Sequence, residues 1–361
     1  MAWTIKNYDH LEFIVGNAKQ AAFYYRSAFG FRLVAYAGLE TGVRDRASYV
    51  LEQGDIRFVL TTPLTPEHPF AEHHKLHGDG VRAITLVVDD VAAVYRDTIA
   101  KGAHSVAEPH VAEDRNGTVQ TASIATFGDT IHTFIDRTKY QGVFLPGYEP
   151  VERDPIHRPA ALQLIDHVVG NMEWNRMNTW VEYYERVFGF HRFWSVDDKQ
   201  LHTDYSALRS TVVASANERI KFPLNEPAPA ARKSQIEEYV EYYRSAGVQH
   251  IAMHTENIIE AVTKLRENGV EFLKIPGSYY ESLEARVGKI DEDVKTLANL
   301  GILVDRDEHG YLLQLFTKPV EDRPTLFLEV IQRKGGQSFG VGNFKALFEA
   351  IERDQAARGN L

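Results

Sequence analysis

The chain has 361 residues, of which 44% are hydrophobic and 25% charged, a composition typical of a globular protein with two or three domains. Its formal net charge of −10 argues against a general nucleic-acid-binding protein. The sequence contains no cysteine, which excludes disulfides, thiolate metal sites and a cysteine nucleophile. No apolar run reaches the ~18 residues of a membrane span, and the first residues lack the pattern of a secretory signal. We therefore expect a cytoplasmic protein, without a membrane or nucleic-acid partner, in which any metal ligands are histidines or oxygen donors.

The two halves of the chain share a sequence pattern, which indicates a duplicated structural unit. In each unit a strand-like segment precedes a helical one, and short strands separated by turn residues follow. We expect an α+β fold with domains over residues 1–150 and 160–361, and with the Pro-, Gly- and charge-rich segment 140–159 as the linker. The matching segments are 8–11 and 165–168, 23–31 and 182–190, 81–84 and 248–251, and, more weakly, 134–137 and 330–333.

Three strand-like segments of the second half each carry one candidate metal ligand: His167, His250 and Glu329. The two-residue period of a strand places each of them on a face with apolar residues. A carboxylate on a buried face is costly unless it is paired, and a metal cation is one possible partner. Two imidazoles and one carboxylate form the facial triad of non-haem Fe(II) oxygenases. From spacing alone, two core histidines and a carboxylate paired with an arginine remain the alternative.

The duplication provides an internal comparison for these ligands. His167 matches His10, but His250 matches Ala83, and Glu329 matches approximately Thr133. The first domain has therefore lost ligands, and we expect it to be a structural or oligomerisation copy.

Two other histidine patterns are weaker metal candidates. The His10-Leu11-Glu12 segment has the H-x-E spacing of some iron sites, but the matching segment 167–169 lacks the carboxylate. A second group lies in a polar stretch that we interpret as a solvated loop, and it consists of His68, His73, His74 and His77.

Several longer motifs of the second half resemble the 4-hydroxyphenylpyruvate dioxygenase family, which belongs to the vicinal-oxygen-chelate superfamily. The resemblance covers nearly the whole chain and is densest over residues 160–361. It implies duplicated glyoxalase/bleomycin-resistance-like domains in which paired βαβββ modules form an open barrel. The motifs are His167, Gln249-His250, Gln314–Pro319, Asp322–Thr325, Glu329–Arg333 and Gly342–Phe348.

The resemblance also implies an activity. Members of this family convert 4-hydroxyphenylpyruvate and O2 to homogentisate and CO2 in tyrosine and phenylalanine catabolism, by oxidative decarboxylation, ring hydroxylation and side-chain migration. One Fe(II) per subunit is expected, with no separate 2-oxo acid cosubstrate because the substrate carries its own oxo acid. The family forms homodimers or homotetramers.

The same resemblance assigns roles to individual residues. His167, His250 and Glu329 would bind the iron. From the residues themselves, a glycine-rich segment followed by apolar residues at helical spacing predicts a final helix over 343–358 with Asn343 as its N-cap, which would close over the substrate as a lid. Without the resemblance, the polar pocket candidates would be side chains that cap strand ends, and the aromatic ones would be core residues. The substrate-pocket candidates are Ser210, Asn225, Gln235, Gln249, Gln314, Phe316, Phe327 and Phe344, and the further lid residues are Phe339, Asn343 and Phe348.

Two alternatives are considered. 4-Hydroxymandelate synthase uses the same metal, substrate and oxygen but hydroxylates the benzylic carbon, and it tends to have a smaller aliphatic residue at the position of Phe344. The presence of Phe344, Pro223 and Asn225 favours the dioxygenase. A metal-free small-molecule-binding protein of the same superfamily is the alternative from another class, and the intact triad argues against it.

Overall fold

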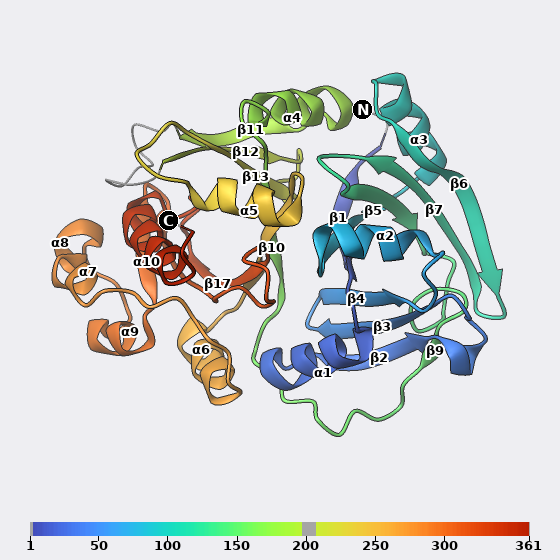
Figure 1. Ribbon diagram of the computed structural model, residues 1–361, viewed down its shortest axis with the longest axis horizontal. Coiled ribbons are helices and arrows are strands. Elements are labelled where there is room, and N and C mark those ends of the chain that lie inside the picture. Colours follow the sequence, from blue (N-terminus) through green and yellow to red (C-terminus); the bar gives the residue numbers. More distant parts are fainter. Residues whose placement is uncertain (1–2, 197–206, 361) are drawn as a thin grey trace.

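The computed structural model, which describes residues 3–196 and 207–360, contains two curled sheets that lie side by side (Figure 1). The first sheet has the strand order β6-β7-β8-β5-β1-β4-β3-β2-β9. Its strands are β1 (Ile5–Ile14), β2 (Arg32–Ala37), β3 (Arg46–Gln53), β4 (Ile56–Pro63), β5 (Gly80–Val88), β6 (Ser105–Asp114), β7 (Gly117–Ala125), β8 (Ile131–Asp136) and β9 (Glu149–Pro150).

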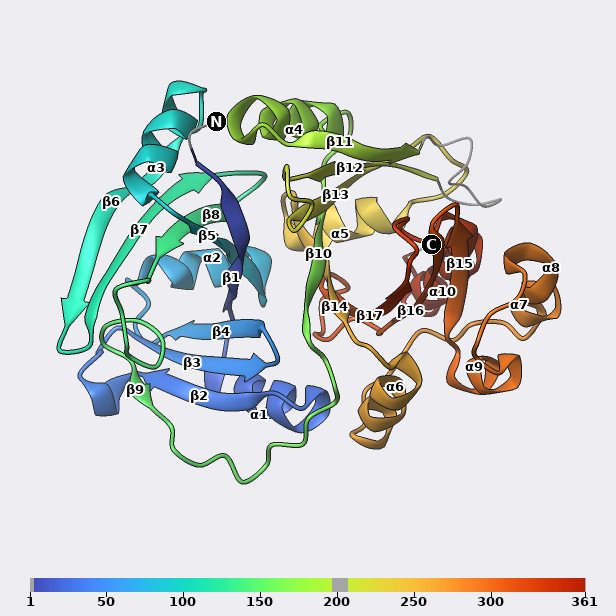
Figure 2. The same cartoon turned by 180° about the vertical axis from the view of Figure 1, so that it is seen from behind.

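The second sheet has the strand order β11-β12-β13-β10-β14-β17-β16-β15. Figure 2 shows the long β10 on the side of this sheet that faces the first one. The strands are β10 (Leu164–Asn171), β11 (His191–Val196), β12 (Leu208–Ala214), β13 (Lys221–Pro227), β14 (Gly247–His254), β15 (Leu303–Asp307), β16 (Gly310–Phe316) and β17 (Phe327–Lys334).

Each sheet is built from two βαβββ modules, as predicted. The modules of the first sheet join where β1 pairs antiparallel with β5, and those of the second join where β10 pairs antiparallel with β14. The helices that follow the first strand of each module are α1 (Ala18–Phe29), α3 (Val91–Ala100), α4 (Met177–Tyr183) and α6 (Ile258–Glu267). The terminal strands of each sheet do not pair with each other, so each barrel is open.

The duplicated sequence sets the helix boundaries locally. Asp90 and Asn257 cap α3 and α6 in the same way, because each side-chain oxygen accepts a backbone N–H three residues later. Gly30 and Gly189 follow the other helical segments and have φ of 76° and 65°. This left-handed backbone conformation ends a helix and favours glycine over other residues.

The remaining helices connect the modules, lie between α6 and β15, or follow the last strand. None of the helices in the described ranges is both long and apolar enough to cross a bilayer. They are α2 (Pro69–His77), α5 (Gln235–Tyr243), α7 (Ser278–Glu281), α8 (Leu283–Val287), α9 (Val294–Leu300) and α10 (Phe344–Ala357), with the short 3-10 segments η1 (Leu39–Thr41) and η3 (Val341–Asn343) and the π-helical turn η2 (Tyr184–Phe188).

The segment after β8 belongs to the first barrel more than to a linker. Phe144 is 1% exposed and packs with Val34 and Val50 of that sheet. Strand β9 adds to the edge of the same sheet by pairing with β2. The interpretation of residues 140–159 as a linker is therefore wrong for its first part, because burial of an aromatic ring outweighs a loop-like composition.

Candidate metal centre and substrate pocket

The candidate ligands lie on three neighbouring strands of the second barrel. In the register of β10 with β14, His167 lies opposite Ala252, and in the register of β14 with β17, Ala252 lies opposite Glu329. His250 is two residues before Ala252 and shares its face. The small Ala252 side chain therefore shares one face of the sheet with the three ligands and lies opposite both His167 and Glu329.

The distances between the candidate ligand atoms fit a single metal ion. Nε2 of His167 and Nε2 of His250 are each 3.3 Å from Oε2 of Glu329. The three ligand atoms lie within 4.8 Å of one another, and all three residues are buried. Two atoms that each lie ~2.1 Å from one metal ion, at angles of ~90–110°, are ~3.0–3.4 Å apart. The group therefore has the donor types and the spacing that a divalent transition ion needs.

The charges of the triad support one another. Burial opposes ionisation of Glu329, but the charge and hydrogen bond of His167 are the main effects that outweigh it and lower the pKa of the carboxyl. Burial also opposes protonation of His167, yet Glu329 and Asp166 raise the pKa of that ring. For His250 burial dominates and lowers the pKa, so this ring is neutral and available as a ligand.

Partners behind the two imidazoles fix which nitrogen faces the centre. Nδ1 of His167 donates to Oδ1 of Asp166 at 2.7 Å, and Nδ1 of His250 donates to Oε1 of Gln249 at 3.0 Å. Arg333 in turn holds Asp166 by two hydrogen bonds of 2.7 and 2.8 Å. Such partners orient metal-binding histidines, and they leave both Nε2 atoms directed at Glu329.

The first barrel keeps this support but not the ligands. Nδ1 of His10 donates to Oδ1 of Asp9 at 2.7 Å, and Arg137 contacts the same carboxylate at 3.3 Å. The strand register places Ala83 and Thr133 where the second barrel has His250 and Glu329.

A threonine takes the position of Ala252 in the first barrel. Thr85 lies opposite His10, and its Oγ1 is 3.1 Å from Nε2 of that histidine. The nitrogen that would bind a metal is therefore already hydrogen-bonded within the protein.

A pocket adjoins the triad, and residues of the triad line it. Like many small-molecule sites, it combines apolar walls with a few neutral polar groups. Predicted pocket residues that line this cavity are Ser210 on β12, Asn225 on β13, Gln235 at the start of α5, Gln249 on β14, Gln314 and Phe316 on β16, Phe327 on β17, Phe339 after β17, and Phe344 and Phe348 on α10.

Asn343 does not line the cavity, and it precedes α10 at the predicted N-cap position without a side-chain bond that caps the helix. Its backbone already has helical angles, so the side chain makes no capping hydrogen bond. Instead, the buried amide donates from Nδ2 to Oε1 of Gln314 at 3.4 Å and accepts from the Tyr279 hydroxyl at 2.6 Å. The residue thus connects the start of α10 to a pocket amide.

The other histidine patterns also differ from expectation. Helix α2 contains His73, His74 and His77, and His68 directly precedes it. His77 is fully buried. The prediction of a solvated loop is therefore wrong. His68 itself accepts the N–H of Phe70 as the helix N-cap, which the polar composition did not indicate. In the His10-Leu11-Glu12 segment, the carboxylate of Glu12 accepts from Thr61 at 2.9 Å and is not grouped with His10 as a metal site.

Sequence reasoning did not assign the residues that hold His167 in place. Asp166 and Arg333 were visible only as parts of the repeat, although Asp-His and a later arginine recur at Asp9-His10 and Arg137. That recurrence was the available signal. The apolar wall residues Val169, Leu208 and Leu347 carried no signal of their own, because they are indistinguishable from core residues in the sequence.

The curled sheets define a protein of paired βαβββ modules, and its triad is a site that can hold a metal ion. A family model described as the glyoxalase/bleomycin resistance protein/dioxygenase superfamily matches residues 7–130 and 164–315. A mutant of 4-hydroxymandelate synthase from Streptomyces coelicolor has a similar structure, with a TM-score of 0.88 and 31% identity over 98% of this chain and 99% of that chain.

Relatives that match over nearly their full length show the family to which the chain belongs. The chain is 52% identical to 4-hydroxyphenylpyruvate dioxygenase of Dictyostelium discoideum, over 99% of this chain and all of that protein. It is 52% identical to the enzyme of the same name from Xenopus tropicalis, over 98% and 93% of the two chains, and 51% identical to that of Aspergillus fumigatus, over 99% and 94%. The chain belongs to the 4-hydroxyphenylpyruvate dioxygenase family.

Proposed function

We propose that this enzyme is an Fe(II)-dependent dioxygenase that converts 4-hydroxyphenylpyruvate and O2 to homogentisate and CO2. The observation that carries the proposal is the buried group of His167, His250 and Glu329 at a cavity lined by aromatic rings and neutral amides. The relatives at about half identity over nearly their full length have this activity in their names.

The proposed metal is one Fe(II) per subunit, bound by His167, His250 and Glu329. Two neutral nitrogen donors and one carboxylate suit Fe(II) and leave coordination positions open for the substrate. When bound, iron(II) supplies a centre at which the oxo acid and O2 are brought together. No separate 2-oxo acid is proposed, because 4-hydroxyphenylpyruvate already contains one.

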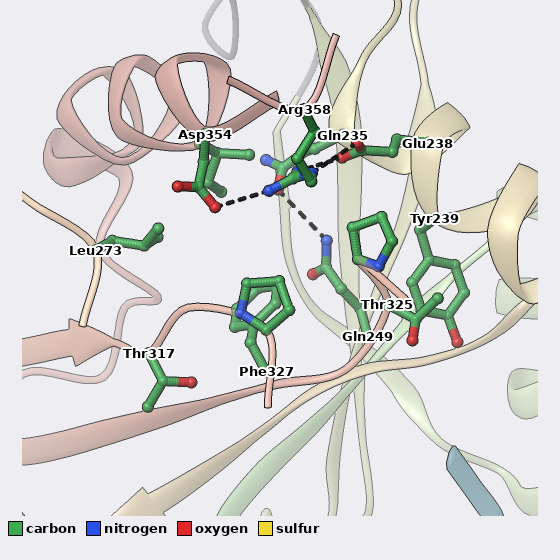
Figure 3. Close-up of a pocket in the computed structure, with 13 residues that line it drawn as sticks. Gln235, Glu238, Tyr239, Gln249, Leu273, Thr317, Thr325, Phe327, Asp354 and Arg358 are labelled. Carbon is green, nitrogen blue, oxygen red and sulfur yellow. Dashed lines mark hydrogen bonds and ion pairs between the residues drawn. The ribbon is translucent and has the colours of Figure 1, made fainter. Parts of the chain in front are cut away.

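Neutral polar side chains would orient the substrate. Gln249 uses its Oε1 to hold His250, and its Nε2 lies 3.5 Å from Oε1 of Gln235 (Figure 3). Gln235, Gln314, Asn225 and Ser210 carry no charge, so they can hydrogen-bond a phenol without an ion next to the ring. Gln314 is held in turn by Asn343, which reduces the freedom of its amide.

Aromatic walls would hold the substrate ring. Phe327 stacks on His250 with ring centroids 4.8 Å apart, and Phe316 meets the same imidazole edge-on at 5.8 Å. Phe339 meets His167 edge-on at 5.1 Å. These rings enclose the triad on the pocket side, and flat apolar surfaces of this kind favour an aromatic substrate.

Helix α10 is proposed as the lid. Phe344 and Phe348 of its first turns line the cavity, so the helix covers it. At the other end, Arg358 forms an ion pair of 2.8 Å with Glu238 of α5 (Figure 3). Glu238 also accepts a hydrogen bond from Asn360 at 2.8 Å. A covered site keeps water from the reacting groups.

Replacing the ligands tests the metal assignment. His167→Ala, His250→Ala and Glu329→Ala should each abolish homogentisate formation and lower the bound iron, because two ligands hold the ion weakly. His10→Ala is the matched control, with the same strand position in the first barrel, and should keep its iron. Normal iron content in all three triad variants would contradict the assignment.

The choice between the two related reactions rests on Phe344. Phe344 lines the cavity, and its ring centroid lies 6.5 Å from that of Trp194, which packs in the same apolar cluster. Homogentisate and 4-hydroxymandelate are isomers, so NMR rather than mass must identify the product. We expect homogentisate from the native chain and a share of hydroxymandelate from Phe344→Ile; hydroxymandelate as the main native product would favour the synthase.

The assembly and location of the protein stay predictions. A homodimer or homotetramer is expected from the family resemblance, and light scattering on the purified protein would measure it. A cytoplasmic location is expected from the sequence, and fractionation of cells would test it.

A further inference from the structure

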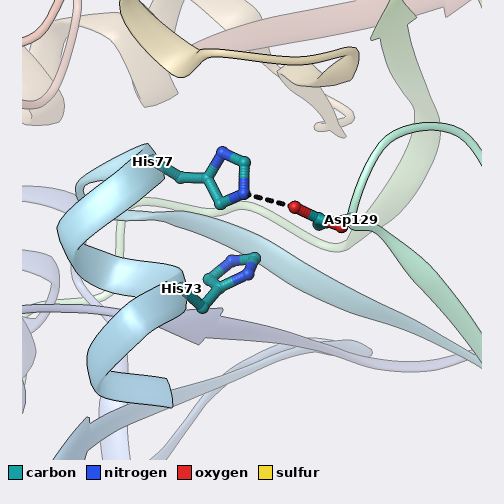
Figure 4. A group of neighbouring side chains, drawn as sticks. All are labelled: His73, His77 and Asp129. Carbon is teal, nitrogen blue, oxygen red and sulfur yellow. Dashed lines mark hydrogen bonds and ion pairs between the residues drawn. The ribbon is translucent and has the colours of Figure 1, made fainter. Parts of the chain in front are cut away.

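A second group of potential metal ligands lies in the first domain, away from the triad. Helix α2 carries His73 and His77 four residues apart, and Asp129 reaches the same point from the loop between β7 and β8 (Figure 4). One donor atom from each residue lies within 4.8 Å of the others. Residues four apart on a helix share a face, so the helix presents both imidazoles to the carboxylate.

The second domain fixes the orientation of His77. Its Nδ1 lies 2.5 Å from the backbone carbonyl of Tyr243, at the end of α5. Since a carbonyl can only accept, Nδ1 carries the proton, and Nε2 is directed toward Oδ2 of Asp129 at 2.8 Å. A histidine held by a carbonyl in this way is typical of metal ligands.

An ion pair between His77 and Asp129 would account for these two residues but not for His73. Among the residues that the structure describes, Nε2 of His73 has no hydrogen-bond partner, although this atom is buried. The rings of His73 and His77 have centroids only 4.5 Å apart. A cation bound by all three side chains would give the buried nitrogen a partner, and an ion pair alone would not.

We propose that His73, His77 and Asp129 bind a second divalent transition cation, of which Zn²⁺ is the type that fits best. Two imidazoles and one carboxylate suit zinc, whereas magnesium and calcium require mainly oxygen ligands. The Asp129 side chain is 58% exposed, so an ion can enter from solvent and keep water as a further ligand. Arg82 acts on His73 with an opposing positive charge, so we expect weaker binding than at a closed site of four ligands.

The position of this site suggests what a bound ion would do. Gly128, next to Asp129, lies so close to the Ala246 carbonyl that a Cβ there would be 2.1 Å from the oxygen. The ion would therefore join α2 and the β7–β8 loop at the surface that contacts the end of α5. It would stabilise the contact between the two domains, close to the start of β14, which carries His250.

Zinc titration of the metal-free full-length protein tests this proposal. We expect two Zn²⁺ per native chain, one at the triad and one at the new site. His73→Gln and Asp129→Asn should each lose one ion or weaken its binding by at least ~10-fold. Glu329→Ala should lose the ion at the triad, so the loss of an ion from the triad can be distinguished from its loss from the new site.

A matched control lies on the same helix. His74→Gln changes the neighbouring histidine, which pairs with Asp79 at 2.9 Å and lies outside the group, and should still bind two ions. Zn²⁺ should also raise the melting temperature of Glu329→Ala, but not that of the variant that also carries His73→Gln. Zinc stoichiometry and affinity unchanged by both His73→Gln and Asp129→Asn would overturn the proposal.

Discussion

Ala252→Thr should convert the metal centre of the second barrel to the state of the first. Thr85 occupies the corresponding position opposite His10, and its Oγ1 lies 3.1 Å from Nε2 of that ring. A metal bound to the same nitrogen would lie ~2.1 Å from it. A hydroxyl in this direction would thus be only ~1 Å from the ion, so His167 can bind either the hydroxyl or the metal.

The expected decrease in Fe(II) affinity follows from the loss of His167 as a ligand. Replacing residues that merely support a ligand already costs ~10–100-fold in metal affinity, so we expect a loss beyond ~100-fold, or ~2.8 kcal/mol. The assay is competition for Fe(II) with a coloured chelator, followed by homogentisate formation. The added atoms fill a buried position, and crowding costs ~1–3 kcal/mol, so circular dichroism must show that the variant is folded.

Two controls separate the hydroxyl from other effects. Ala252→Gly changes the same position without adding a hydroxyl and should retain iron. Thr85→Ala removes the corresponding hydroxyl from the first barrel and should leave iron content unchanged, because that barrel lacks the other two ligands. A folded Ala252→Thr protein that binds Fe(II) as tightly as the native chain would refute this reasoning.

Three further predictions concern the lid, the first barrel and pH. Glu238→Gln removes the ion pair at the end of α10 and should increase the O2 consumed per homogentisate formed while iron content stays the same; unchanged coupling would contradict a role in closure. Phe144→Ala should lower the free energy of unfolding by ~3–5 kcal/mol in urea, with normal iron content, and a loss below 1 kcal/mol, roughly, would show that the ring is not part of the core. Burial opposes ionisation of Asp9, but its histidine and arginine neighbours lower its pKa from 3.8 to about 2. The ionised form therefore stabilises the fold fully above about pH 4 by ~2–3 kcal/mol and ceases to do so as pH falls toward 2. Asp9→Asn should accordingly be less stable than the native chain by a constant amount from about pH 5 to 8, and a difference that grows on acidification would contradict this sign.

The sequence marked the triad residues as candidate ligands, but spacing alone left core residues as the alternative. Glu329 is a carboxylate in an apolar strand, and the duplication set His167 against His10. That these strands are neighbours depends on the pairing of β10, β14 and β17, which spacing along the chain does not determine. The family resemblance supplied this information, and the position of the small residue Ala252 opposite His167 and Glu329 became visible only in the register.

The differences between the predictions and the structure share one physical cause. His77, Phe144 and Asn343 lie in segments whose composition indicates loops or caps, but each side chain is buried by contacts distant in sequence. His77 bonds to the Tyr243 carbonyl, Phe144 packs against His10, and Asn343 bonds to Gln314. Local propensity cannot anticipate such contacts, because tertiary packing overrides it.

The same kinds of residue contact the first histidine in both barrels, and they include an aromatic ring that meets the imidazole edge-on. Phe144 meets His10 at 5.1 Å and 76°, and Phe339 meets His167 at 5.1 Å and 75°. The first barrel therefore keeps the contacts that orient the imidazole, although it lacks the other two metal ligands. A protein engineer who wished for a two-centre enzyme would need to add donors at positions 83 and 133 and remove the hydroxyl at 85, without building a new scaffold.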